Sequence, residues 1–258
     1  MGARWTPAIL LHNQAWRLFV PIFLHGGVLH LLMNVAAQVV IGIQAEFKWG
    51  MEKLPQESQE SRNHTHDGRS FGAAEAGHAS GHYRSTAPLW GTGRVISIYL
   101  LSGVLGNVLA SVAEGTNGNL GVGASGAILG LIGGEAVFLW STWKLWEDQQ
   151  RFGRARGMGL SLVFIVIVGA AANKTIDNWA HLGGFLAGLV FGCFAHFKNF
   201  TDQGLRIVVG LTGFVGLCGW AGMIAVLLTH TKQQQQHLPG LCAACLDSGT
   251  FLLNALER

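Results

Sequence analysis

Long apolar blocks separated by short polar joints dominate the pattern of this chain. A bilayer crossing needs about 20 apolar residues in a helix, and several blocks approach that length. Backbone polar groups in hydrocarbon must be satisfied internally, so such blocks are expected to be helical. The pattern predicts an all-α, polytopic transmembrane helical bundle with six spans, at residues 28–46, 95–113, 124–142, 157–172, 178–197 and 205–229.

Two stretches break the apolar pattern before the C-terminal tail. Residues 1–27 mix prolines and tryptophans with apolar positions, which is typical of an interfacial loop segment. Residues 50–92 are rich in Gln, Ser, His and Gly and predict a disordered insertion. The expected organisation is a helical core at 28–49 and 93–197, an additional C-terminal transmembrane helix at 205–229, and a tail at 230–258.

Composition supports a membrane protein. Half of the residues are apolar, only 12% are charged, and there are 37 glycines. The net charge of +3 is small and its cations are scattered, so the sequence offers no basic stripe for nucleic acid. Most Lys and Arg lie in the joints that share a side with residues 50–92, which places that insertion in the cytoplasm. We expect an integral, multi-pass protein whose partner is the lipid bilayer, in the plasma membrane or secretory pathway.

A serine stands between glycines where one apolar block begins. Ser125 lies in the run Gly123-Ala124-Ser125-Gly126, which is either a close helix-packing face or the setting of a nucleophile. His181 lies on a second small-residue face, in the span at 178–197. If the faces meet, the Ser125 hydroxyl and the His181 imidazole can form the hydrogen bond that an activated serine needs. The glycines expected to permit this approach are Gly126, Gly130, Gly184 and Gly188.

Two polar residues share one face of the first span. His30 and Asn34 are four positions apart, so their side chains lie on the same side of a helix. They are either an interhelical polar pair that holds the bundle together or functional donors, since polar groups in hydrocarbon are costly.

Together these motifs resemble the rhomboid family of intramembrane serine proteases, in its eukaryotic "6+1" form. The resemblance covers residues 12–196 approximately and rests on the motifs Trp16-Arg17, His25, His30-x-x-x-Asn34, Gly123-x-Ser125-Gly126 and Ala180-His181-x-x-Gly184-x-x-x-Gly188.

The resemblance implies a Ser125–His181 catalytic dyad that needs no metal or cofactor. It also implies an oxyanion site at His30, Asn34, Gly123 and Ser125, and a structural loop containing Trp16, Arg17 and His25. Substrates would be single-span transmembrane proteins, cut near the outer or lumenal membrane surface. The alternative is an inactive rhomboid-like protein that binds transmembrane clients for trafficking or degradation.

Several residues depart from the family or remain open. The family has a spanning helix before its Trp-Arg loop, and we expect this chain to lack it. Leu129 stands where the family often has an aromatic residue that packs on the histidine. Asp177 is interpreted as a helix cap rather than a third catalytic residue, and Glu135 has no assigned role. The pair Cys242 and Cys245 permits a disulfide, acylation or a zinc site.

Overall fold

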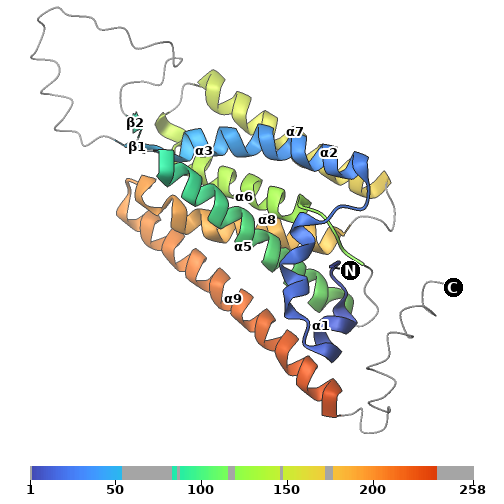
Figure 1. The fold of residues 1–258 in the computed structure, drawn as a ribbon. Helices are drawn as coiled ribbons and strands as arrows, with labels where there is room; N and C mark the ends of the chain where they lie inside the picture. Colours follow the sequence, from blue (N-terminus) through green and yellow to red (C-terminus); the bar gives the residue numbers. More distant parts are fainter. Residues whose placement is uncertain are drawn as a thin grey trace, which may run out of the picture.

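The computed structural model is a bundle of helices (Figure 1). It describes residues 2–53, 83–85, 88–115, 120–145, 148–171 and 177–236 of the 258-residue chain. The predicted all-α bundle is confirmed, with one small addition. Met51–Lys53 (β1) pairs antiparallel with Tyr83–Ser85 (β2), so a short two-stranded ribbon lies between helices.

The N-terminal half of the described chain is made of short pieces. It contains α1 (Thr6–His12), the 3-10 helices η1 (Ala15–Leu18) and η2 (Val20–Phe23), α2 (Val28–Ala37), the π-helical segment η3 (Gln38–Gly42) and α3 (Ile43–Trp49). Longer helices follow: α5 (Pro88–Glu114), α6 (Ser125–Ser141), α7 (Asp148–Ala171), α8 (Asn178–Ala195) and α9 (Gln203–Gln236), with the 3-10 turns η5 (Trp143–Leu145) and η7 (Phe197–Asn199).

Four helical segments among the described residues are long and apolar enough to cross a bilayer. They are Val28–Trp49, Gly91–Glu114, Asn178–Ala195 and Gln203–Thr229. Helix α6 is apolar but has only 17 residues. Helix α7 begins earlier than the predicted span at 157–172, and its first half carries the arginines of the preceding joint, which lowers its hydropathy.

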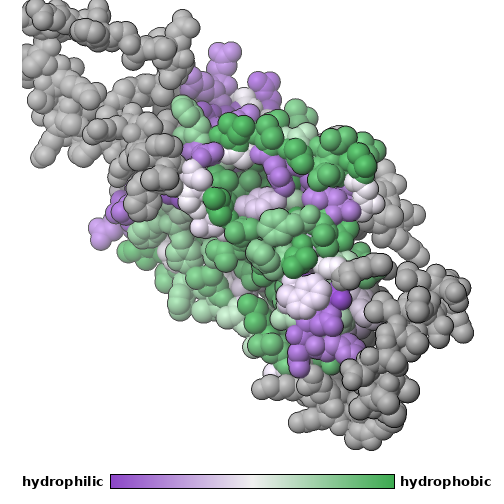
Figure 2. All heavy atoms as spheres, viewed as in Figure 1, coloured by the Kyte–Doolittle hydropathy of each residue, from purple (hydrophilic) through white to green (hydrophobic). Residues whose placement is uncertain are grey.

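The centre of the bundle is formed by α5, α6 and α8, which pack against one another. Most of α6 is buried, whereas the outer helices expose large apolar side chains. Figure 2 shows such side chains along α2, where Val28 and Leu29 are more than two-thirds exposed. Exposed aliphatic side chains on helices of this length fit contact with lipid.

Two helices extend beyond the predicted spans at 95–113 and 205–229 into the neighbouring segments, although the apolar parts of both helices, Gly91–Glu114 and Gln203–Thr229, agree with those spans. Helix α5 begins at Pro88, inside the predicted insertion, because proline is well suited to the first turn of a helix. Helix α9 continues to Gln236, inside the predicted tail, because Lys and Gln propagate a helix and the first Pro-Gly pair comes at Pro239. The expected disorder at residues 54–82, and the Cys242–Cys245 pair, lie outside the described residues.

The N-terminal segment combines a buried part with exposed aromatic side chains, since Ile9, Leu10 and Ile22 are buried while Trp16, Phe19 and Phe23 are about half exposed. Ile9 and Leu10 of α1 are buried and form an apolar cluster with Leu227 of α9. A short helix of seven residues is stable only with such tertiary packing. The N-terminal segment is therefore held against α9 at the end of the bundle that carries the site described below (Figure 1).

Candidate active site

Helices α6 and α8 touch through their backbones. A Cβ atom added at Gly184 would lie 2.0 Å from the carbonyl oxygen of Gly126, and one added at Gly188 would lie 2.0 Å from that of Gly130. Real Cβ atoms do not approach oxygen so closely, so only glycine fits at these positions. The four glycines expected to support helix packing therefore form the contact itself, as small residues do between membrane helices.

This contact brings a serine and a histidine together. The Oγ atom of Ser125 lies 2.6 Å from Nε2 of His181, although the residues are 56 positions apart. Ser125 begins α6 and His181 lies in the first turn of α8, so both stand at the same end of their helices. With the imidazole proton on Nδ1, the His181 Nε2 atom accepts a hydrogen bond from the serine hydroxyl.

His30 approaches the loop that precedes the serine. Gly123 has a φ of +130°, which favours glycine, and a Cβ there would lie 2.9 Å from Cε1 and 3.0 Å from Nε2 of His30. The backbone N–H of Gly26 donates to Nδ1 of His30 at 3.4 Å. In a neutral imidazole whose Nδ1 accepts, the proton sits on Nε2. In that tautomer the Nε2–H of His30 would face the serine loop.

The remaining residues of the expected oxyanion site differ in what they can donate. Asn34 is buried, and its Nδ2 donates to the backbone oxygen of His30 at 2.8 Å, which leaves one of its two amide hydrogens. The N–H of Gly123 donates to the Pro21 oxygen at 2.9 Å, so Gly123 shapes the loop rather than offering a donor. The N–H of Ser125 stands at a helix start, where it lacks a partner within its helix.

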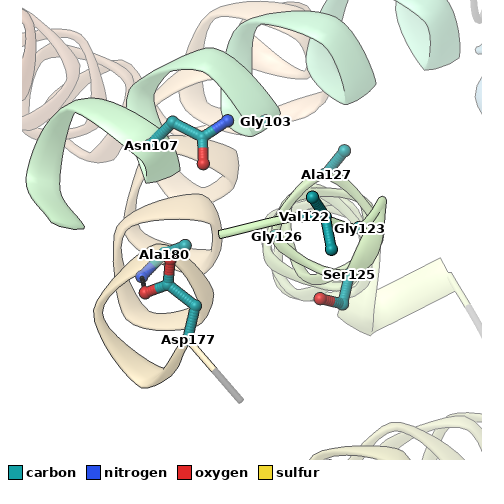
Figure 3. A pocket seen from close by; sticks show the side chains of 9 residues that line it. All are labelled: Gly103, Asn107, Val122, Gly123, Ser125, Gly126, Ala127, Asp177 and Ala180. Carbon is teal, nitrogen blue, oxygen red and sulfur yellow. Dashed lines mark hydrogen bonds between the residues drawn. The ribbon is translucent and has the colours of Figure 1, made fainter. Parts of the chain in front are cut away.

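Asp177 caps α8. Its Oδ1 accepts from the N–H of Ala180 at 2.9 Å, and its Oδ2 accepts from Arg4. Figure 3 shows the hydrogen bond to Ala180 beside the pocket that Ser125 also lines. Both carboxylate oxygens of Asp177 are thus engaged away from the imidazole of His181, which fits its interpretation as a helix cap.

One known family matches most of this chain. The model of the Rhomboid domain matches residues 12–54 and 84–198, which is more than half of the chain. The chain belongs to the rhomboid family. With its apolar helices, it is an integral, multi-pass membrane protein.

Curated relatives include proteins named as proteases. The chain is 28% identical over 219 residues to Rhomboid-like protease 3 of Toxoplasma gondii, covering 84% of this chain and 65% of that protein. It is 28% identical over 194 residues to RHOMBOID-like protein 1 of Arabidopsis thaliana, covering 74% of this chain and 37% of that protein. It is 27% identical over 202 residues to Rhomboid-like protease 1 of T. gondii, covering 78% of this chain and 54% of that protein. The chain thus spans less than two thirds of the length of these rhomboids.

The loop residues expected to be structural lie beside the site. The Arg17 guanidinium stacks 4.6 Å above the Trp16 ring and donates from Nη1 to the Ala3 oxygen at 2.9 Å. His25 packs edge-on against His30 with ring centroids 5.3 Å apart. Burial and the neighbouring His30 lower the pKa of His25. The rhomboid loop thereby joins the N-terminal segment to the His30 helix.

Two polar residues beside the site were not singled out from the sequence. Asn107 of α5 lines the same pocket as Ser125 and donates from Nδ2 to the Leu18 oxygen at 2.9 Å (Figure 3). An amide inside an apolar span is a signal that could have identified it. Arg4 is the second residue, and besides the nearby Thr6 its side chain binds Glu114 and Asp177, which lie 110 and 173 positions away in the sequence.

Glu135, which had no role assigned from the sequence, forms hydrogen bonds at the other end of the bundle. Glu135 of α6 accepts from Nζ of Lys48 at 2.5 Å and from Nε1 of Trp49 at 3.0 Å. These bonds join α6 to the end of α3, away from the serine. Leu129, four residues after the serine, is also buried and packs inside the bundle.

Proposed function

We propose that this rhomboid is an intramembrane serine endopeptidase in which Ser125 is the nucleophile and His181 the general base. The observation that carries the proposal is the 2.6 Å contact between Ser125 Oγ and His181 Nε2 at the end of apolar helices. A serine hydroxyl is a weak nucleophile until a base removes its proton as it attacks. The half-buried pair supplies that base within hydrogen-bond distance.

The reaction follows from this pair. His181 Nε2 takes the hydroxyl proton while Ser125 Oγ attacks the carbonyl carbon of the substrate peptide. His181 then gives that proton to the leaving amine, which breaks the C–N bond and leaves an acyl-enzyme. His181 Nε2 then takes a proton from water, whose oxygen attacks the acyl carbon; the C–O bond to Ser125 breaks, the carboxylic acid product leaves, and the imidazolium returns its proton to Ser125 Oγ.

Three donors would stabilise the tetrahedral intermediate. They are Nε2–H of His30, the unused amide hydrogen of Asn34 and the backbone N–H of Ser125. Each preorganised donor is worth about 3–4 kcal/mol in a poorly solvated site. Gly123 would support them by allowing the His30 ring to lie against the serine loop.

The position of the dyad suggests the class of substrate. Ser125 and His181 stand in the first turns of α6 and α8, so peptide bonds would be cut near one membrane surface. A transmembrane helix shields its carbonyl groups and must open locally before attack. We propose single-span transmembrane proteins with Gly, Pro or other weak helix formers near the outer or lumenal surface as substrates.

The test is cleavage of a helix-weak transmembrane reporter by purified protein in liposomes. We expect the parent protein to cut the reporter, and the Ser125→Ala and His181→Ala variants to lose at least about 10³-fold in rate. Equal cleavage by these variants would exclude the dyad. A serine-reactive fluorophosphonate should label the parent at Ser125. A protein that binds clients without cleaving them would leave that serine unlabelled.

A further inference from the structure

Arg4 is a buried cation that joins three separate segments of the chain. Arg4 is 1% exposed. Its Nη2 atom donates to Oε2 of Glu114 at 2.9 Å and to Oδ2 of Asp177 at 2.5 Å. Its backbone pairs with Gly121, with N–H to oxygen distances of 2.8 and 2.9 Å in the two directions. The end of α5, the loop before Ser125 and the start of α8 therefore meet on one residue.

The ion pair lies directly against the serine loop. A Cβ atom added at Gly121 would lie 2.8 Å from Nε of Arg4 and 2.9 Å from Oδ2 of Asp177. The guanidinium and the carboxylate thus pack on the bare α-carbon of Gly121. Any shift of this loop toward or away from α8 would strain or open that contact.

The two residues that Arg4 contacts here, Gly121 and Asp177, each lie four residues before a member of the dyad. Gly121 comes four residues before Ser125. Asp177 caps α8 and its backbone oxygen accepts from the N–H of His181 at 3.0 Å. Both carboxylates bind the same nitrogen of Arg4, so without the cation two acidic groups would face each other at low exposure, and their repulsion would push the loop and the helix apart.

We propose that Arg4 is a positioning residue that sets the separation of Ser125 and His181. The inference rests on the proposed protease function and adds a residue that lies outside the part matched by the Rhomboid domain. Arg4 is buried away from solvent, so it acts through Gly121 and Asp177 and touches no substrate. Its loss should therefore lower kcat and the reactivity of Ser125 while leaving KM unchanged.

The experiment measures kcat, KM and the fluorophosphonate labelling rate of purified full-length protein in liposomes. We expect Arg4→Met to lower kcat and the labelling rate at least tenfold at unchanged KM. Arg4→Lys, which keeps the charge, should recover most of both. Arg206→Met is the matched control, because Arg206 bonds the Phe200 oxygen at the other end of α8, and it should behave as the parent.

A double-variant cycle adds a second test, and the labelling rate of the double variant alone remains decisive if Arg4→Met folds poorly. Asp177→Asn retains the oxygen that caps α8 but weakens the tie to Arg4. In Arg4→Met/Asp177→Asn the repulsion is relieved, so we expect a folded protein that still labels slowly, with the two effects less than additive. Parental labelling by the double variant, or strictly additive effects, would overturn the role of Arg4. Absence of labelling in the parent would instead reject the protease proposal.

Discussion

Replacing Gly184 by alanine tests whether the backbone contact of α6 and α8 holds the dyad together. The new Cβ would lie 2.0 Å from the oxygen of Gly126, while ordinary contact begins at 3.4 Å, so α8 must retreat by about 1.4 Å. Gly126 is next to Ser125, whose hydroxyl is 2.6 Å from His181. The same displacement would take that pair beyond hydrogen-bond reach.

Two effects of different size follow from this displacement. Overpacking of this kind costs about 1–3 kcal/mol in stability. Misplacing a reacting group by about 1 Å costs about 10²-fold in rate. We therefore expect Gly184→Ala to unfold at a moderately lower temperature in detergent and to cleave a transmembrane reporter at about one hundredth of the parental kcat.

The matched control is Gly222→Ala on α9. Gly222 has no atom within 4 Å of an added Cβ, so the same substitution should leave activity intact and stabilise the helix by about 1 kcal/mol. Reporter cleavage and thermal unfolding should be measured on both variants in parallel. If Gly184→Ala matched Gly222→Ala in both measurements, the close helix contact would not be what positions the dyad.

Three further predictions concern the oxyanion donors, a buried histidine and the distant ion pair. His30→Ala and Asn34→Ala should each lower kcat by about 10²–10³-fold with little change in KM; a raised KM at constant kcat would argue for substrate binding instead. Burial lowers the pKa of His196 to about 3, so between pH 6.5 and 3 the unfolded state takes up a proton that the folded state does not. The free energy of unfolding should then fall by about 1.4 kcal/mol for each pH unit of acidification. His196→Leu should remove this contribution when unfolding is measured as a function of pH, and equal pH slopes in the parent and the variant would contradict the prediction. Lys48→Met removes the ion-pair partner that lies within 2.5 Å of the half-buried Glu135 carboxylate and should lower the unfolding temperature more than Lys48→Met/Glu135→Gln does, whereas a greater loss in the double variant would show that the pair is not the cause.

The sequence by itself determined the class of the fold and the candidate dyad. The length and hydropathy of the apolar blocks reflect contact with lipid, which acts on each segment independently of its neighbours. The glycine faces around Ser125 and His181 could also be recognised, because a run of small residues at helical spacing leaves a local pattern. Helix ends were less accurate, as at Pro88 and Gln236, because one residue more or less changes little in local propensity.

Only the tertiary structure decided how the site is held. Arg4 binds carboxylates 110 and 173 positions away, and such contacts leave no periodicity in the chain. The hydrogen bond from the Gly123 N–H to the Pro21 oxygen also depends on where the two loops meet. Lipid contact acts on one segment at a time and can be read locally, whereas hydrogen bonds between segments exist only once the bundle has closed.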